Sequence, residues 1–495
     1  MDTEFYALLK NKTWILVPRR PGMSVIDNRW VYRVKLNKDG TVQRLKACLV
    51  TKGFQQQLGV DFYETFSPVV KSSTIRVILH LSASNQWDIQ EVDIDNAFLN
   101  CTLSKTVYME QPASYVNTSH PHYVCKLQKA LYGLRQAPRA WFDRLQQVLS
   151  SIGFCSSVSD PSLFFYKQGD AELYLLVYVD DILLIGNNNL TVRGIIAKLQ
   201  QFFLLKTLGC VNYFLSFKIT RGAYGIHLSL SKYTIDLLNK THMLHSKPSP
   251  TPISQSDKLS LNDSKVFDHP SFFRSVMGGL QYLTLSHPDI AFTVNKLSQF
   301  MHSPTQHHWN VCKRLLRYLK GTIGQGILFK PSKEWNVECF SDADWAGSID
   351  DRKSTTGYCV YIGGNLITWC SKKQKAVAKS STEAEYRALS QTATEIAWLY
   401  SLFTELGIKH KLLTVIWCDN AGANQLSSNP MFHSSTKHIE VDVHYVRDLI
   451  KQGIVEVRHI PTSEQTAHIF TKPLSISQFS YLKDKLAIVD QASQA

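Results

Sequence analysis

Two adjacent aspartates interrupt a strongly apolar stretch of the chain. Residues 173–179 and 182–185 consist of Leu, Ile, Val and Tyr, and only Asp180 and Asp181 separate them. Such runs are typical of the strands of a tight hairpin, which would place both carboxylates at its tip. An ordinary Asp-containing turn has the same pattern. Two neighbouring carboxylates beside a core repel each other, however, and a divalent cation would relieve that repulsion.

A second acidic spot lies in residues 92–99, Val-Asp-Ile-Asp-Asn-Ala-Phe-Leu. In a strand, Asp93 and Asp95 share one face. The segment could equally be an exposed strand edge. Together with the hairpin, it can bring three carboxylates to one point. Hard oxygen ligands of this kind suit Mg²⁺, and paired metal ions suit in-line phosphoryl displacement.

Three further acidic segments occur towards the C-terminus. Residues 341–347 (Ser-Asp-Ala-Asp-Trp-Ala-Gly) follow a predicted strand, and residues 417–420 (Trp-Cys-Asp-Asn) end another. Between them, residues 380–386 (Ser-Ser-Thr-Glu-Ala-Glu-Tyr) open a predicted helix with Ser or Thr as caps. Each segment alone indicates little, because acids are common at helix starts. Along the chain, the first acidic segment follows a strand, the second begins a helix and the third ends a strand.

The elements that must position these acids follow two patterns. Residues 1–70 predict short strands and turns, with a hairpin signal at Asp39-Gly40, and residues 71–240 mix helices with strands. An amphipathic helix is expected at 140–151, with one apolar face formed by Trp141, Leu145, Val148 and Leu149.

A Pro- and Ser-rich segment at 246–265 is typical of a linker. From about residue 336 the pattern suggests a separate α/β domain. Its expected elements are strands at 337–340 and 356–369, a helix at 382–406, a strand at 413–418 and a helix at 441–451.

Composition bounds the class of protein. A chain of 495 residues exceeds what one core usually supports, so two to four domains are expected. The net charge of +14 favours a polyanionic partner, with nucleic acid first and an anionic membrane second. No run is apolar enough for a membrane helix, no signal-peptide core is present, and the ten cysteines form no CxxC pair. We therefore expect a soluble intracellular protein, in the cytoplasm or nucleus.

The acidic segments and their neighbours resemble a known family. Residues 178–181 (Tyr-Val-Asp-Asp) are similar to the YVDD box of reverse transcriptases, and residues 92–99 to their first palm motif. In detail, the chain resembles the Pol polyprotein of copia-type LTR retrotransposons over nearly its whole length. Further motifs that carry this resemblance are Lys-Ala-Cys-Leu-Val at 46–50, Lys-Gly-Phe-Gln at 52–55, Glu-Thr-Phe-Ser-Pro-Val at 64–69, Leu-Tyr-Gly-Leu-Arg-Gln-Ala-Pro-Arg-Ala-Trp at 131–141, Tyr-Leu-Thr at 282–284 and Pro-Asp-Ile at 288–290.

The resemblance implies the C-terminal portion of such a polyprotein. Its fold would be an α+β polymerase with palm, fingers and thumb, followed by an α/β ribonuclease H-like domain. The implied boundaries are reverse transcriptase at 1–240 (fingers, palm and start of the thumb), thumb and connection at 241–335, the ribonuclease H-like domain at 336–476 and a C-terminal tail at 477–495.

The same resemblance assigns roles at the first site. Asp93, Asp180 and Asp181 would hold two Mg²⁺ ions, with Mn²⁺ as a substitute, one activating the primer 3′-hydroxyl and one clamping the incoming triphosphate. Phe98 matches the aromatic steric gate against a ribose 2′-hydroxyl, although a core aromatic remains the alternative. The other candidates are Gln136, in the nucleotide and template pocket, and Lys35 and Lys46, as triphosphate ligands.

At the second site, Asp342, Glu385 and Asp419 match the carboxylates of ribonuclease H, which also uses paired Mg²⁺. The family pattern Gln-x-Ala-Asp places a fourth carboxylate where this chain has His468. Three other departures from the family are Cys48 for Arg, Cys101 for Gly and Ser216 for Gly. Each of the four is reachable by one base change, a pattern typical of a decaying copy.

The leading hypothesis is an RNA-directed DNA polymerase with an appended ribonuclease H domain, which His468 would impair. Its expected partners are an RNA template, a DNA primer, RNA/DNA hybrid and dNTPs. An inactive relic that only binds nucleic acid is the alternative, and a general endonuclease is a weaker one.

Overall fold

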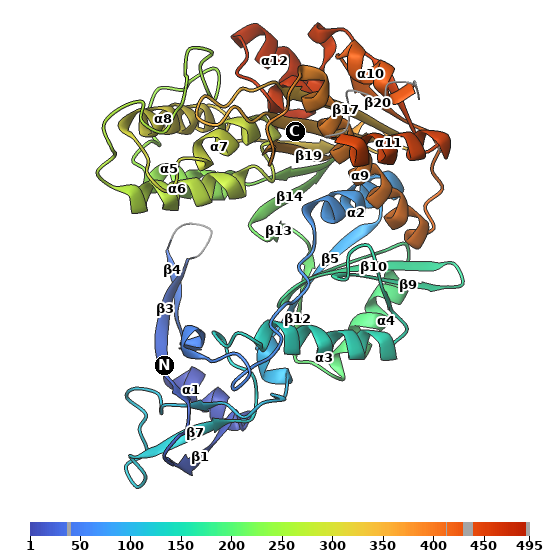
Figure 1. Ribbon diagram of the computed structural model, residues 1–495. Helices are drawn as coiled ribbons and strands as arrows, with labels where there is room; N and C mark the ends of the chain where they lie inside the picture. The colour runs from blue at the N-terminus through green and yellow to red at the C-terminus, as the bar shows by residue number, and fades with distance from the viewer. Residues whose placement is uncertain (37–40, 412, 429–438, 492–495) are drawn as a thin grey trace. The chain divides into compact units, whose positions relative to one another are not determined.

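The computed structural model describes residues 1–36, 41–411, 413–428 and 439–491. They form two compact units, coloured along the chain in Figure 1. Unit 1 comprises Met1–Val70 and Asp88–Cys210, and unit 2 comprises Lys71–Trp87 and Val211–Ala495. Each unit is described by itself.

The central sheet of unit 1 is antiparallel and six-stranded, in the order β12-β5-β11-β10-β9-β8. Helices α3 (Ala137–Ser151) and α4 (Asn189–Gln200) share one buried apolar cluster with the strands β10 and β11. The predicted apolar face of the first helix is buried as expected. The strand bounds are β5 Asp88–Ile94, β8 Cys155–Ser156, β9 Leu163–Gln168, β10 Ala171–Tyr178, β11 Asp181–Gly186 and β12 Leu205–Cys210.

The rest of unit 1 is built mostly from strands, as the sequence of residues 1–70 predicts, but it begins with a helix that was not predicted. The long hairpin of β3 (Asn28–Leu36) and β4 (Val42–Thr51) confirms the two expected strands, whereas its Asp39-Gly40 turn lies outside the described residues. The remaining elements are α1 Asp2–Lys10, η1 Gly53–Gln55, η2 Ala97–Asn100 and a sheet of β1 Trp14–Pro18, β7 Tyr123–Leu127, β6 Tyr108–Met109 and β2 Val25–Ile26.

One sheet of unit 2 joins segments from distant parts of the chain, in the order β13-β14-β15-β16-β22. Its last strand belongs to the segment expected as a C-terminal tail, which also forms α12 (Ile476–Lys485). The other strands are β13 Tyr213–Phe214, β14 Phe217–Gly222, β15 Gly225–Ser229, β16 Gln325–Phe329 and β22 Ile488–Asp490. The helices of this part are α2 Ser72–Asn85, α5 Ser231–Lys240, α6 Pro270–Leu283, η3 Pro288–Ile290, α7 Ala291–Ser298 and α8 Gln306–Lys320.

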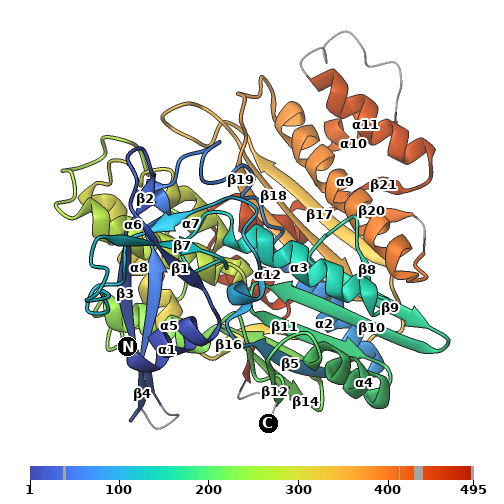
Figure 2. The same cartoon turned by 90° about the horizontal axis from the view of Figure 1, so that it is seen from below.

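The other sheet of unit 2 is mixed, in the order β19-β18-β17-β20-β21. β17, β18 and β19 pair antiparallel, whereas β17, β20 and β21 pair parallel. Figure 2 shows α9 alongside this sheet, with α10 and α11 beyond it. The bounds are β17 Val337–Asp344, β18 Thr355–Ile362, β19 Asn365–Lys373, α9 Ser381–Leu406, β20 Thr414–Cys418, α10 Ala421–Ser428, α11 Glu440–Lys451, β21 Val455–His459, η5 Thr462–Glu464 and η6 Thr466–Phe470.

The elements predicted from residue 336 onward are thereby confirmed within a few residues at each end, except that the strand expected at 356–369 is two strands, β18 and β19, joined by a turn at Gly363 and Gly364. Residues 246–265, all of them described, contain no helix or strand and lie within unit 2. Nowhere in the described chain does a helix combine the length and apolarity needed to cross a bilayer.

Candidate active sites

The apolar hairpin of β10 and β11 turns one residue earlier than predicted. Val179 and Asp180 form the turn, and Asp181 is the first residue of β11, opposite Tyr178. The predicted turn at Asp180 and Asp181 was wrong. It would pair Val179 with Ile182, whereas the sheet pairs Val177 with Ile182, so each cross-strand partner differs by two residues.

The turn is held in an unusual backbone conformation. Val179 has φ = 55°, which is unfavourable for a β-branched residue. Its carbonyl oxygen accepts a 2.6 Å hydrogen bond from the indole Nε1 of the buried Trp141 in α3. The helix therefore fixes the turn that carries Asp180.

The sheet register brings the three predicted acids of the first site together. Asp93 on β5 lies directly opposite Asp181 on β11. The backbone N–H of Ile94 also donates to the carbonyl of Asp180, at 3.2 Å. Asp93, Asp180 and Asp181 all line one cavity of about 580 Å³, which we call the acidic cavity.

The carboxylates in and beside this cavity perturb one another. Burial and the nearby Asp180 and Asp95 raise the pKa of Asp93. Burial, with Asp181 and Asp93, raises the pKa of Glu91 to about 7. Because these acids resist ionising together and offer only hard oxygen donors, their donor set fits divalent cations such as Mg²⁺.

Basic side chains from the β3–β4 hairpin line the same cavity. They include Lys46, a predicted triphosphate ligand, together with Arg33 and Arg44. Lys206 on β12 also lines it and forms a 2.7 Å ion pair with Asp95. Lys35 lies in β3 opposite Arg44, but its side chain is outside the described part of the structure.

Tyr132 belongs to this site, and reasoning from the sequence alone missed it as a site residue. Its hydroxyl donates to Asp180 Oδ2 at 3.2 Å, and its ring lines the acidic cavity. Burial, followed by the charge and the hydrogen bond of Asp180, raises its pKa. The sequence feature that could have identified Tyr132 is the glycine that follows it. Gly133 has φ = 94° and lies so close to the Thr51 carbonyl that Tyr132 is brought against β4.

The predicted steric gate lies behind Tyr132. The ring of Phe98 is 5% exposed, and it contacts the Tyr132 ring edge-on at 4.5 Å between centroids. Among the described residues that line the acidic cavity, Tyr132 is present and Phe98 is not. Phe98 can therefore shape the cavity through Tyr132.

Gln136 lines a second cavity of about 600 Å³ in unit 1, which we call the Gln136 groove. Its amide donates to the carbonyl of Asp61 at 3.0 Å and accepts from Gln56 Nε2 at 3.0 Å. The basic side chains that line this groove are Lys105, Arg139 and Arg144.

In unit 2, parallel pairing brings the acids of the second site together. Phe340 on β17 is opposite Trp417 on β20, so Asp342 and Asp419 each lie two residues further on at the same end of the sheet. Glu385 on α9 approaches from the helix and accepts a 3.2 Å hydrogen bond from the backbone N–H of Ala343. Burial, with Asp342 and Asp419, raises the pKa of Glu385 to about 10.

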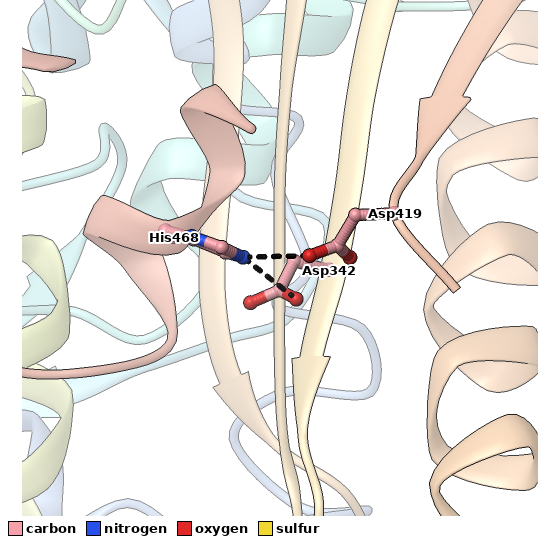
Figure 3. A group of neighbouring side chains, drawn as sticks. All are labelled: Asp342, Asp419 and His468. Carbon is pink, nitrogen blue, oxygen red and sulfur yellow. Dashed lines mark hydrogen bonds and ion pairs between the residues drawn. The ribbon is translucent and has the colours of Figure 1, made fainter. Parts of the chain in front are cut away.

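His468 lies between the two aspartates (Figure 3). Its Nε2 is 3.1 Å from Asp419 Oδ2 and 3.5 Å from Asp342 Oδ1. The side chains of His468 and Asp342 are only 2% and 1% exposed. A surface position for His468, the alternative to a role in this site, is therefore excluded.

Two contacts fix the segment that carries His468. The amide of Gln465 donates to the carbonyls of Ser341 and Trp417, at 3.0 and 3.3 Å, next to the two acidic strand ends. η6 also packs so closely on β18 that a Cβ at Gly357 would lie 2.8 Å from Phe470 Cβ. Burial alone would raise the pKa of Asp419, but the hydrogen bond and charge of His468, with Lys472, hold it below its usual value.

Comparison with known proteins gives the family. Residues 11–255 match the family model described as reverse transcriptase (RNA-dependent DNA polymerase). The chain is 46% identical over 490 residues to the "Retrovirus-related Pol polyprotein from transposon RE2" of Arabidopsis thaliana. The alignment covers 99% of this chain and 34% of that protein. The chain belongs to the copia-type retrotransposon Pol family.

A second Pol relative comes from another plant. The "Retrovirus-related Pol polyprotein from transposon TNT 1-94" of Nicotiana tabacum is 38% identical, over 98% of this chain and 37% of that protein. This member of the Pol family thus spans about a third of the length of these relatives. The expected reverse transcriptase region is confirmed by the match of residues 11–255.

Two solved structures are also similar to this chain. A foamy viral protease-reverse transcriptase in complex with RNA/DNA hybrid has 12% identity and a TM-score of 0.49, covering 93% of this chain and 54% of that one. LC11-RNase H1 in complex with RNA/DNA hybrid has 12% identity and a TM-score of 0.22, covering 28% of this chain and 94% of that one.

Proposed function

We propose that the chain is an RNA-directed DNA polymerase that extends a DNA primer along an RNA template. The observation that carries this proposal is the meeting of Asp93, Asp180 and Asp181 in one cavity that Lys46 and two arginines also line. Acids and cations around one cavity suit a metal-bound triphosphate. The family match of residues 11–255 supports the same activity.

Asp93, Asp180 and Asp181 would hold two Mg²⁺ ions, for which their oxygen donors and mutual repulsion are suited. Bound ions would supply activation of the primer 3′-hydroxyl and neutralisation of the triphosphate charge. The protein itself orients this donor set. Trp141 fixes the Val179–Asp180 turn, and the hydroxyl of Tyr132 holds one oxygen of Asp180.

The remaining candidates would bind the substrates. Lys46, with Lys35 further along the hairpin, is proposed to contact triphosphate oxygens, to which point-charge ammonium groups are suited. Phe98 and Tyr132 would close the sugar side of the nucleotide pocket. Gln136 would act on the template side, where its groove combines basic side chains with the exposed ring of Tyr63, a combination typical of single-strand binding.

The proposed subdomains follow from these roles. The six-stranded sheet with α3 and α4 would be the palm, and the β3–β4 hairpin with the β1-β7-β6-β2 sheet would be the fingers. We retain 1–240 as the reverse transcriptase, 241–335 as thumb and connection, 336–476 as the ribonuclease H-like domain and 477–495 as the C-terminal segment.

For the ribonuclease H-like domain, Asp342, Glu385 and Asp419 are the proposed catalytic acids, acting on RNA/DNA hybrid. The residues present do not fit a pair of Mg²⁺ ions, because His468 puts nitrogen where a fourth oxygen donor is expected and lies within 3.5 Å of two of the acids. This favours a second candidate function for the domain, binding of hybrid without efficient cleavage.

The polymerase proposal is tested by primer extension on poly(rA)/oligo(dT) with Mg²⁺. Asp181→Asn should lower the extension rate at least about 100-fold, since it removes charge from the reacting centre. Hybrid affinity should change little, because it comes mostly from phosphate contacts elsewhere. Asp170→Asn, on an exposed turn of the same unit, is the matched control. Extension by Asp181→Asn at the rate of the unmodified chain would overturn the assignment.

A further inference from the structure

The second site contains a set of metal-ligand atoms that differs from the four carboxylates implied by the family. An oxygen of Asp342, an oxygen of Asp419 and a ring nitrogen of His468 all lie within 4.8 Å of one another. Hard Mg²⁺ prefers oxygen ligands, whereas imidazole suits ions such as Zn²⁺, Co²⁺ and Mn²⁺ better. The donor atoms therefore select against the ion that the family implies.

The spacing of these atoms is that of ligands on a single ion. The Nε2 of His468 is 3.1 Å from Asp419 Oδ2 and 3.5 Å from Asp342 Oδ1. An ion with bonds of about 2.1 Å separates neighbouring ligands by about 3.0 Å in octahedral and about 3.4 Å in tetrahedral geometry. The two spacings from His468 therefore already match those between ligands of a bound ion.

The surroundings hold each ligand in place. Figure 3 shows the His468 ring nitrogen directed at both carboxylates, and Gln465 anchors the segment behind it. The second oxygen of Asp342 is engaged by the Thr471 hydroxyl and lies 3.7 Å from Lys472 Nζ, which leaves Oδ1 facing His468. Asp342 Oδ1 thus lies on the His468 side, where an ion would bind, and the nearby ammonium group disfavours a second ion.

We propose that Asp342, Asp419 and His468 form a site for one transition-metal ion of the Mn²⁺, Co²⁺ and Zn²⁺ class, selective against Mg²⁺. The ligands are two carboxylate oxygens and the Nε2 of the neutral imidazole. Glu385, which lies beside the two aspartates, completes the surroundings of the ion. This proposal is independent of the polymerase activity, because it concerns other residues and is measured by binding.

The test uses the full chain carrying Asp180→Asn and Asp181→Asn, so that ions at the acidic cavity do not contribute. Mn²⁺ is the probe, and electron spin echo modulation detects coordinated nitrogen. We expect one bound Mn²⁺ with imidazole nitrogen coupling. We also expect an affinity for Mn²⁺ at least about tenfold higher than that for Mg²⁺ measured by competition.

Two variants in the same background give the decisive comparison. His468→Asp should abolish the nitrogen coupling while retaining Mn²⁺, and should raise the affinity for Mg²⁺. His444→Gln, at an exposed histidine of α11, is the matched control and should keep the coupling.

Circular dichroism of each protein establishes that it is folded. A spectrum without nitrogen coupling, equal affinities for Mn²⁺ and Mg²⁺, or coupling that survives in His468→Asp would overturn the proposal.

Discussion

Trp141 Nε1 donates a 2.6 Å hydrogen bond to the carbonyl of Val179, 38 residues further along the chain. This contact joins helix α3 to the strained turn that carries Asp180. A β-branched residue leaves the left-handed region readily unless its surroundings hold it there. The position of Asp180 therefore depends on an indole that has no place in the chemistry itself.

Trp141→Phe should lower the primer-extension rate by about tenfold while the affinity for hybrid stays nearly unchanged. The variant keeps most of the buried ring but removes the donor, so the Val179 turn can relax and Asp180 moves from its place beside Asp93. Single-turnover extension with saturating nucleotide measures the rate.

The control is Trp345→Phe, which removes a comparable 3.1 Å indole–carbonyl hydrogen bond, to Ala378, in unit 2. It should leave extension unchanged. Equal rates for Trp141→Phe and the unmodified chain would show that the turn holds its conformation without the indole.

Phe98→Ala should weaken discrimination against ribonucleotides. The buried Phe98 ring supports the Tyr132 ring, which lines the acidic cavity. Removing it leaves a space into which Tyr132 can tilt, so that the cavity admits a 2′-hydroxyl, while deoxynucleotide use should fall only modestly. The measurement is the ratio of kcat/KM for dNTP and the matching rNTP. An unchanged ratio would assign Phe98 to the core alone.

The regular elements were predictable because they depend on local pattern. The helix Ser381–Leu406 has a Ser cap, an apolar period and a final Gly407 with φ = 66°, and all three signals are readable in sequence. The register between strands was not predictable. The pairing of Asp93 with Asp181 depends on contacts across the sheet, and the turn at Val179 runs against local preference.

Contacts between distant segments were equally hidden. Nothing local indicates that β22 pairs with β16, or that the Tyr132 hydroxyl reaches Asp180. His468 is different, because the neighbouring Gln465 and Ala467 fixed its alignment with the family pattern. Its position between Asp342 and Asp419 follows from that alignment.

Ser216→Gly should raise the thermal unfolding midpoint of unit 2. Leu215 and Ser216 form the two-residue turn between β13 and β14, with φ values of 50° and 64°. Turns with two positive φ values favour Gly at the second position, and the exposed Ser216 side chain has no core packing to lose. We expect a gain of about 0.5–1 kcal/mol.

Differential scanning calorimetry measures the effect of Ser216→Gly. Ser216→Ala is the control, because it removes the hydroxyl but keeps the Cβ, and it should not stabilise the protein. A lower unfolding midpoint for Ser216→Gly than for Ser216→Ala would show that the positive φ of Ser216 does not destabilise the turn.

The stability of unit 2 should fall in mild acid because of His80. This α2 residue is fully buried, its ring contacts Trp335, and its Nδ1 accepts from Asn365 Nδ2 at 3.1 Å. Its Nε2 has no hydrogen-bond partner among the described residues. Burial lowers the pKa of His80 from 6.5 to about 4, since a charged ring there would lose its hydration.

Between pH 6.5 and pH 4 the unfolded chain binds the His80 proton more strongly than the folded chain. The contribution of His80 is therefore complete above pH 6.5 and is lost as the pH falls towards 4. The loss in the free energy of unfolding amounts to about 2 kcal/mol at pH 5.

His80→Gln, which keeps an acceptor for Asn365 and carries no charge, should remove this part of the acid sensitivity. The exposed His302→Gln is the control. Urea unfolding at pH 7.5 and pH 5 measures the difference, and equal losses in His80→Gln and the unmodified chain would place the acid sensitivity elsewhere.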